Sequence, residues 1–220
     1  MWATIIKMWN RYSYVYIQGL TGTLCLAAIT VLCGTVLGTL LAIMRRSRIK
    51  PFQWFIQFYV WVLRGTPILL QLYFFWIFLP RATGIKIPDS TCIIIALIVN
   101  ASSYVSEIIR AGIQAVDIGQ TEAARSLGMT ARNTMTKIIL PQAVKNILPS
   151  LANEFVSLVK ESAILSFIGV IDIMFTANTV KNATYDSFGP YLFAAAIYFV
   201  LTFTLSKLVG LLEKKMAASN

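Results

Sequence analysis

The stretch "LTGTLCLAAITVLCGTVLGTLLAIM", residues 20–44, carries no charged side chain anywhere along its length. About 20 consecutive apolar residues suffice for a helix to cross the hydrocarbon core of a bilayer. The whole chain agrees with this local signal: of its 220 residues, 57% are hydrophobic and 13% are charged, against about 25% charged in soluble domains. Mean hydropathy is +0.71. We therefore predict an all-α integral membrane protein rather than a soluble helical domain.

Further apolar segments follow the first, and together they predict five membrane spans in a single transmembrane domain covering residues 1–220. Polar residues and prolines interrupt the second and fourth spans, so the bounds of these two are the least well defined. An odd number of spans places the two termini on opposite sides of the membrane. The predicted spans are Leu20–Met44, Phe52–Leu79, Thr91–Ile109, Ile147–Val170 and Tyr191–Leu212.

Lysine and arginine are more frequent in the loops on one side of these spans. An excess of basic residues in short loops marks the cytoplasmic face. The N-terminus is therefore predicted outside, with the C-terminus and the loop at residues 112–146 in the cytoplasm. A net charge of +10 would suggest nucleic acid in a soluble protein, but lipid orientation explains it here, and no nucleic-acid partner is expected. The basic residues of the predicted cytoplasmic side are Arg45, Arg46, Arg48, Lys50, Arg125, Arg132, Lys137, Lys145, Lys214 and Lys215.

Several kinds of catalytic site are excluded by composition. The chain has no histidine, so it has no Ser-His-Asp triad, no Cys-His pair and no histidine-ligated metal. Cys25, Cys33 and Cys92 lie in or beside apolar runs without a C-x-x-C pair, and we expect them to be small buried hydrophobes rather than a disulfide or metal site. No Gly-Lys pair occurs, so a phosphate-binding P-loop is absent. We expect no catalytic residue, metal site or cofactor in this chain.

Small residues recur every four positions in the first span, at Thr30, Gly34 and Gly38. Such a row allows another helix to approach closely. Glycines scattered at random in a membrane helix would produce the same spacing, so both interpretations stay open.

Residues 112–146 are the most polar long stretch of the chain and lie between two apolar segments. A first helix is expected over Gln120–Leu127, with Thr121 as its N-cap and Glu122 in its first turn, where acidic charge opposes the macrodipole. Gly128 is the candidate C-cap. A helix of this kind in a polar loop predicts a docking element rather than a linker.

A second helix is expected directly after the first. Thr130 can cap a helix over Ala131–Leu140, which Pro141 would help to close. The loop is then a bent, charged pair of short helices facing the cytoplasm.

The same loop carries a long motif. E-A-A, three residues, Gly, nine residues and I-x-L-P are all present, as Glu122, Ala123, Ala124, Gly128, Ile138, Leu140 and Pro141. This pattern resembles the EAA loop of the membrane-spanning subunits of binding-protein-dependent ABC importers. "RGTPILLQL" at 64–72, "SSYVSEIIRAGIQAV" at 102–116 and "LANEFVSLVKESAILSFIGV" at 151–170 resemble the polar amino acid uptake branch of that family.

This resemblance implies a type I ABC importer permease fold that works with partners. In the family, the first short helix of the loop enters a cleft of an ABC ATPase subunit, which binds ATP and magnesium. A second permease chain, identical or closely related, and an extracytoplasmic substrate-binding protein complete the importer. Carried onto this sequence, Glu122–Gly128 is the coupling helix. The implied ATPase-coupling residues are Glu122, Ala123, Ala124, Arg125, Gly128, Leu140 and Pro141.

Ionisable side chains also fall inside or near the predicted spans, at Arg64, Glu107, Glu154, Lys160 and Glu161. Each costs on the order of 2.5–3.5 kcal/mol at a helix centre, so several together require partners or a water-lined cavity. The sequence Arg-Gly-Thr-Pro at 64–67 breaks the second span, because proline removes a backbone donor. Irregular backbone at membrane depth is tolerated where it lines a cavity.

Two helix faces collect the polar residues. Asn100, Ser103 and Glu107 recur at i, i+3 and i+7, and Glu154, Ser157 and Glu161 repeat that interval in the fourth span. We predict that these stripes line a pathway for polar amino acids, and that Glu154 and Glu161 attract a zwitterionic or cationic one. The predicted substrate-binding residues are Thr66, Gln71, Asn100, Ser103, Glu107, Asn153, Glu154, Ser157 and Glu161.

Other interpretations remain open at this stage. The charged residues can instead form interhelical pairs, for example Lys160 with Glu154 or Glu161, while Arg64 and Glu107 can snorkel to the interface. As to function, alternatives are an importer of methionine, metal or phosphate, a stand-alone ion-coupled transporter or channel, and a membrane anchor. The sequence does not choose among amino acids such as arginine, histidine and glutamine, and does not decide between a homodimer and a heterodimer.

Overall fold

The structure is a computed structural model that describes residues 2–47 and 49–217, and every regular element in these ranges is a helix. The predicted all-α fold is therefore confirmed. Arg48, one of the basic residues used to predict orientation, lies outside the described residues. The α-helices are α1 (Trp2–Met44), α2 (Lys50–Gly65), α3 (Ile68–Thr83), α4 (Asp89–Gln114), α5 (Ile118–Ser126), α6 (Ala131–Thr134), α7 (Leu140–Glu161), α8 (Ile173–Thr184) and α9 (Gly189–Ala217).

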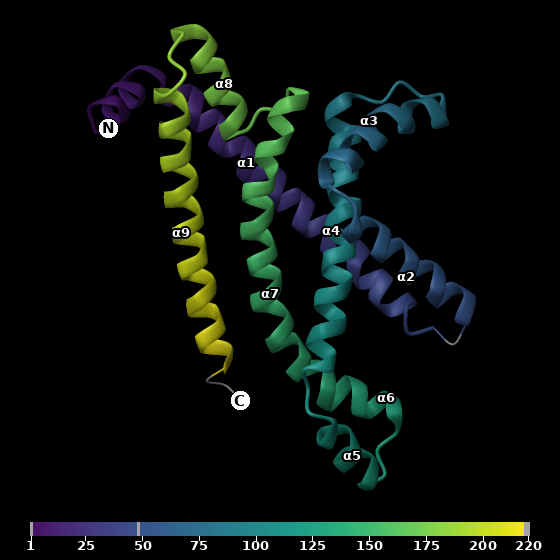
Figure 1. Cartoon of the computed structure of the whole chain (residues 1–220). Helices are drawn as coiled ribbons and strands as arrows, with labels where there is room; N and C mark the ends of the chain where they lie inside the picture. Colours follow the sequence, from purple (N-terminus) through teal and green to yellow (C-terminus); the bar gives the residue numbers. More distant parts are fainter. Residues whose placement is uncertain (1, 48, 218–220) are drawn as a thin grey trace. The chain divides into compact units, whose positions relative to one another are not determined.

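Two non-α segments extend this helical path. A π-helical turn, η1 (Met135–Ile139), joins α6 to α7, and a 3-10 helix, η2 (Ser162–Ile168), follows α7. Figure 1 shows the order of the helices along the chain, with the short α5 and α6 following α4.

The described helices pack into two compact units. The first comprises the chain up to Val31 together with Leu72–Leu97 and Phe155–Lys207, and the second comprises Leu32–Gln71, Ile98–Glu154 and the chain from Leu208 onward. Neither unit is continuous in sequence, because α1, α3, α4, α7 and α9 each contribute residues to both. The single transmembrane domain over residues 1–220 stays a prediction.

The number of candidate membrane spans agrees with the sequence. In the described ranges, Met8–Met44, Asp89–Gln114 and Gly189–Met216 are each long and apolar enough to cross a membrane alone. Two bent pairs qualify only as pairs: α2 with α3, bent by 111°, and the 131–168 stretch with α8, bent by 44°. Counting each pair as one span gives the five predicted, and the two bent spans are the two predicted to be interrupted.

The bounds of the elements differ from prediction in two places. Helix α1 begins at Trp2, well before the expected start at Leu20, because no glycine or proline interrupts the polar and aromatic residues ahead of Gly19. Helix α8 was missed, since Asn178 and Lys181 weaken its apolar signal.

The expected burial of the cysteines is right for one and wrong for two. Cys92 is buried, whereas Cys25 and Cys33 are exposed on α1. A small apolar side chain on a membrane helix is accommodated by lipid as well as by protein, so apolar surroundings in the sequence do not imply burial within the chain.

In the second unit, the glycine row of α1 lies directly against α4. A Cβ added to Gly34 would lie 2.9 Å from the Cβ of Ala101. One added to Gly38 would lie 2.7 Å from the Cβ of Val105 and 2.8 Å from the carbonyl oxygen of Ser102. Of the two interpretations that the sequence left open, close helix approach is the one that the structure shows at Gly34 and Gly38.

In the first unit, polar contacts between sequence-distant residues join α1, α8 and α9. The buried hydroxyl of Tyr16 donates to the carbonyl of Pro190 over 3.0 Å. Asp172, fully buried, caps α8 by accepting from the backbone N–H of Phe175 at 2.6 Å and also accepts from the hydroxyl of Tyr198 at 3.1 Å. These bonds fix the start of α8 against α9 and satisfy a carboxylate that would be costly to bury alone.

Candidate functional site

A sharp break separates α2 from α3 at Thr66 and Pro67. Thr66 has extended backbone (φ −115°, ψ 146°), which is the conformation favoured before proline. Pro67 has no N–H to donate, so the carbonyl of Leu63 loses its helical partner. The sequence prediction of a broken ladder at this point is confirmed.

Gln71 supplies the donors that the break removes. Its Nε2 group lies 2.7 Å from the carbonyl oxygen of Leu63 and 3.1 Å from that of Thr66. It also lies 2.8 Å from the hydroxyl of Thr66. A side chain four residues into α3 thus replaces the backbone N–H that proline lacks.

Asn100 on α4 completes this arrangement. Its Nδ2 group donates to Oε1 of Gln71 over 2.8 Å, and both amides are almost fully buried. Ser103, also buried, donates to the carbonyl of Asn100 over 2.7 Å. The structure therefore brings Thr66, Gln71 and Asn100 together, and it uses their polar groups on one another and on the backbone.

Glu107, the last member of the α4 stripe, is surrounded by arginines. Its carboxylate lies 3.0 Å from Arg45 and 4.0 Å from Arg64, and it forms a further ion pair with Arg110 one turn away. Arg64 also lies over the ring of Tyr104, 5.3 Å from its centroid. The open alternative of ion pairing is the one that the geometry favours for Glu107.

None of these three arginines is among the predicted site residues, and Arg64 alone was noted as an ionisable residue near a predicted span. Arg110 stands at i+3 from Glu107, a spacing that favours ion pairs on a helix and was readable from the sequence. Arg45 follows α1 and is far from Glu107 in sequence, so no local pattern places it beside that carboxylate.

The second stripe, on α7, is more open. Asn153 and Glu161 are exposed, and Glu154 and Ser157 are partly buried. Lys160 is exposed as well. The same i, i+3, i+7 spacing therefore produces a buried, bonded face on α4 and an accessible face on α7.

Asn153 also lines a polar pocket of about 360 Å³ in the second unit. The pocket contains none of Thr66, Gln71 and Asn100. Charged side chains of both signs, Lys145 and Glu213, border it. The two lining residues from α9, Glu213 and Met216, were absent from the predicted site, since nothing in the sequence pairs α7 with the end of α9. The lining residues are Ala115, Lys145, Asn146, Pro149, Ser150, Asn153, Glu213 and Met216.

The first helix of the polar loop begins earlier than predicted. Helix α5 has Asp117 as its N-cap, whose side chain accepts from the N–H of Gly119 at 2.6 Å. The assignment of the cap to Thr121, with Glu122 in the first turn, is therefore wrong, because Asp117 offers a short acceptor one turn sooner. At the other end Gly128 has φ +79° and follows the C-cap, as expected for the glycine that ends a helix.

The second helix of the loop is capped as predicted and ends much later. The hydroxyl of Thr130 accepts from the N–H of Asn133 over 3.2 Å. The chain then remains helical through η1 into α7, so the prediction that Pro141 closes the helix is wrong. Pro141 lies in the first turn of α7, and the π-helical turn just before it widens the hydrogen-bond ladder where the proline has no N–H.

The loop presents most of its predicted coupling residues to the surroundings. Helix α5 packs on α6 and η1 through the buried Ala124, and Figure 1 shows the two short helices beyond the ends of α4 and α7. Two apolar side chains of this region are also highly exposed, Ile118 at 75% and Leu127 at 84%. The exposed predicted residues are Glu122, Ala123, Arg125, Gly128, Leu140 and Pro141.

Comparison with known proteins assigns the family. Residues 34–218 match the model of the family described as "Binding-protein-dependent transport system inner membrane component". A putative glutamine transport system permease protein of Rickettsia conorii is 43% identical over 98% of this chain and 99% of its own length. An arginine transport system permease protein of Bacillus subtilis is 40% identical over 93% of each chain.

A solved structure supports the same assignment. The crystal structure of an amino acid ABC transporter with histidines contains a chain that is 47% identical, with a TM-score of 0.91 over 96% of this chain and 98% of that one. The apolar bent spans and the capped polar loop agree with the family match, which covers most of the chain. This chain therefore belongs to the binding-protein-dependent transport system inner membrane component family.

Proposed function

We propose that this chain is the permease subunit of an ATP-driven importer that moves polar amino acids by alternating access. The family supports this assignment, as do the two relatives named as a putative glutamine and an arginine transport system permease protein. The N-terminus is outside, the C-terminus and the polar loop are in the cytoplasm, and a second permease chain completes the pathway. This chain holds no cofactor; ATP and magnesium are bound by the ATPase partner.

The observation that carries the coupling role is the construction of α5. A side-chain cap at Asp117 and a left-handed glycine at Gly128 define both ends of a short helix. The buried Ala124 anchors it, whereas Ile118 and Leu127 expose apolar surface next to charged residues. Exposed apolar groups with a polar rim are typical of protein interfaces. Helix α5 therefore docks on the ATPase subunit and transmits its closure to the membrane helices.

This docking is tested with a single charge. Leu127→Asp places a carboxylate on the proposed contact, and it should abolish co-purification of the ATPase subunit and solute-stimulated ATP hydrolysis. The control is Ile85→Asp, another highly exposed apolar residue (64%), in the loop before α4, which should retain the ATPase subunit. Equal recovery of the ATPase subunit with both variants would refute a contact through α5.

Recognition of the amino acid is proposed to lie mainly on α7. The amides near Pro67 and the carboxylate of Glu107 are engaged within the chain, whereas the α7 face is accessible at Asn153 and Glu161. The carboxylates of Glu154 and Glu161 attract the ammonium group of a zwitterionic amino acid and favour cationic ones further. Thr66, Gln71, Asn100, Ser103 and Glu107 then shape the pathway rather than contact the solute first.

Uptake into proteoliposomes that contain the whole importer tests this assignment. Arginine, glutamine and histidine are compared for Glu154→Gln and Glu161→Gln, with Asp89→Asn as an exposed carboxylate control at the start of α4. We expect arginine uptake to fall more than glutamine uptake in the α7 variants only. Unchanged rates for all three solutes would remove the two carboxylates from recognition. Uptake that persists without any ATPase subunit would instead favour a stand-alone ion-coupled transporter.

A further inference from the structure

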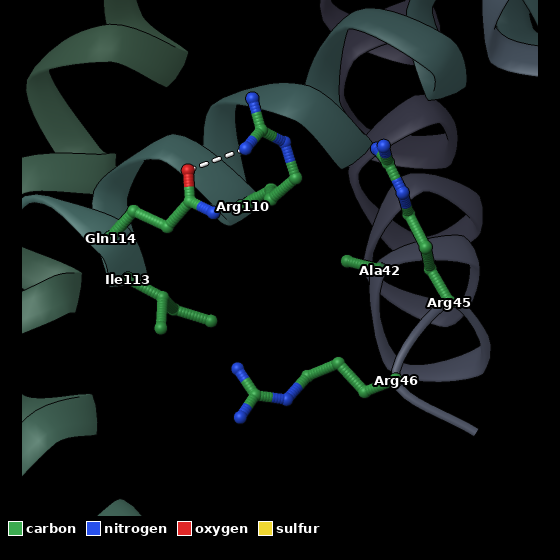
Figure 2. A pocket seen from close by; sticks show the side chains of 6 residues that line it. All are labelled: Ala42, Arg45, Arg46, Arg110, Ile113 and Gln114. Atoms are coloured by element: carbon green, nitrogen blue, oxygen red, sulfur yellow. Dashed lines mark hydrogen bonds between the residues drawn. The ribbon is translucent and has the colours of Figure 1, made fainter. Parts of the chain in front are cut away.

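A small pocket in the second unit lies where α1 ends beside the last turns of α4, and its volume is about 210 Å³. Figure 2 shows three arginine side chains bordering it: Arg45 and Arg46 directly follow α1, and Arg110 comes from α4. Ala42 and Ile113 provide its apolar wall, and Gln114 completes the lining.

The pocket carries more positive charge than its surroundings neutralise. Arg45, Arg64 and Arg110 all share the single carboxylate of Glu107. No salt bridge in the described part of the chain involves Arg46. Its guanidinium reaches toward the pocket from the side opposite Arg110 (Figure 2). The three guanidinium groups that border the pocket, two of which share Glu107 with Arg64, give it a net positive charge.

The remaining polar group of the pocket is also a donor. Arg110 donates to Oε1 of Gln114, as the dashed line in Figure 2 marks. The side-chain amide N–H groups of Gln114 take no part in this bond and are available to an acceptor in the pocket. The lining thus combines guanidinium and amide donors, and its one carbonyl acceptor is already used.

We propose that this pocket binds an anionic phosphate group, carried by a phospholipid headgroup or free in solution. Guanidinium groups bind phosphate through pairs of parallel hydrogen bonds. A volume equal to roughly seven water molecules, at about 30 Å³ each, holds a phosphate with the first atoms attached to it. It is smaller than the 300–1,000 Å³ typical of sites that enclose a complete ligand.

The position of the pocket fits a headgroup. Arg45 and Arg46 come directly after Met44, the last residue of a candidate membrane span. Just before them on α1, Leu40 and Ile43 expose 50% and 63% of their surface, so exposed apolar surface for an acyl chain lies within two helical turns of the basic residues. Basic pockets between membrane helices on the cytoplasmic side are known to accept anionic lipid headgroups.

The test uses the complete importer, purified in detergent and stripped of lipid. Phosphatidylglycerol and phosphatidylcholine are added in separate arms, bound lipid is counted by native mass spectrometry, and a third arm titrates labelled inorganic phosphate at constant ionic strength. Arg46→Gln is the informative variant, because it leaves the ion pairs of Glu107 in place. Arg81→Gln removes the same charge from an exposed position at the end of α3 and serves as the matched control.

The arms separate the two sources of phosphate. A lipid headgroup is supported if Arg46→Gln binds phosphatidylglycerol at least tenfold more weakly than the wild type and Arg81→Gln do. Phosphatidylcholine must then show no such difference. The same tenfold loss confined to inorganic phosphate supports the free anion. Equal affinities for the two variants in every arm, or no binding to the wild type, overturn the proposal. No arm measures transport, so this outcome is independent of the proposed function.

Discussion

Adding one methyl group at Gly38 tests the close packing of α1 on α4. In Gly38→Ala the new Cβ would lie 2.7 Å from the Cβ of Val105 and 2.8 Å from the carbonyl oxygen of Ser102. Neither atom is the far end of a flexible side chain, so the helices themselves must separate. Overpacking of this kind costs about 1–3 kcal/mol. Replacing glycine by alanine inside a helix recovers about 0.8–1.0 kcal/mol, which leaves a net loss of about 0–2 kcal/mol.

Gly210→Ala is the matched control for this change. Gly210 is also helical, on α9, and a Cβ there meets nothing within 4 Å. The propensity gain is common to both variants, so their difference in unfolding free energy isolates the steric cost at about 1–3 kcal/mol. Tryptophan fluorescence during reversible SDS titration in mixed micelles measures that difference. Identical midpoints for the two variants would show that α1 and α4 are not in close contact.

Three further changes follow from the same geometry. Gln71→Leu removes the donors to Leu63 and Thr66 and leaves the buried Asn100 amide unpaired. The same titration should therefore show a loss of about 1–3 kcal/mol in unfolding free energy. A stability equal to wild type would contradict the bonding at the break. Glu107→Gln leaves Arg45, Arg64 and Arg110 without this counterion. Because the Glu107 side chain is 20% exposed, we expect the unfolding free energy to fall by less than the roughly 3–5 kcal/mol typical of fully buried pairs. Added salt should relieve part of this loss. Gly128→Ala strains a backbone at φ +79° by about 1–2 kcal/mol and should speed amide hydrogen exchange at the end of α5. Gly65→Ala is the control, because a Cβ there meets nothing within 4 Å, and it should leave that exchange unchanged.

The sequence predicts the features that depend on local chemistry. An uncharged apolar run must enter lipid, so the candidate spans follow from composition. Proline lacks an N–H wherever it stands, so the break at Pro67 is predictable, and a four-residue row of small side chains explains the approach at Gly34 and Gly38. The motif around Glu122 was long enough to indicate the family.

What the sequence misses depends on competition or on distant partners. Asp117 and Thr121 are both good N-caps, and it is Asp117, four residues earlier, that caps α5 in the structure. Pro141 can end a helix or stand in its first turn, and the π-helical turn before it makes the second possible. Arg45 reaches Glu107 across 62 positions of sequence, a distance over which no periodicity carries information.

The two polar stripes show why spacing alone does not identify a binding site. On α4, Asn100 engages Gln71 of α3, which in turn bonds the carbonyls at the Pro67 break, and the arginines neutralise Glu107. The polar side chains of the α4 stripe are thereby satisfied inside the chain, as the low dielectric surroundings require. On α7, Asn153 and Glu161 remain accessible. A polar side chain that remains accessible at membrane depth requires water, a solute or another subunit around it, and Asn153 and Glu161 are such accessible residues on α7. That requirement, rather than the shared i, i+3, i+7 interval, directs the search for the transported amino acid to α7.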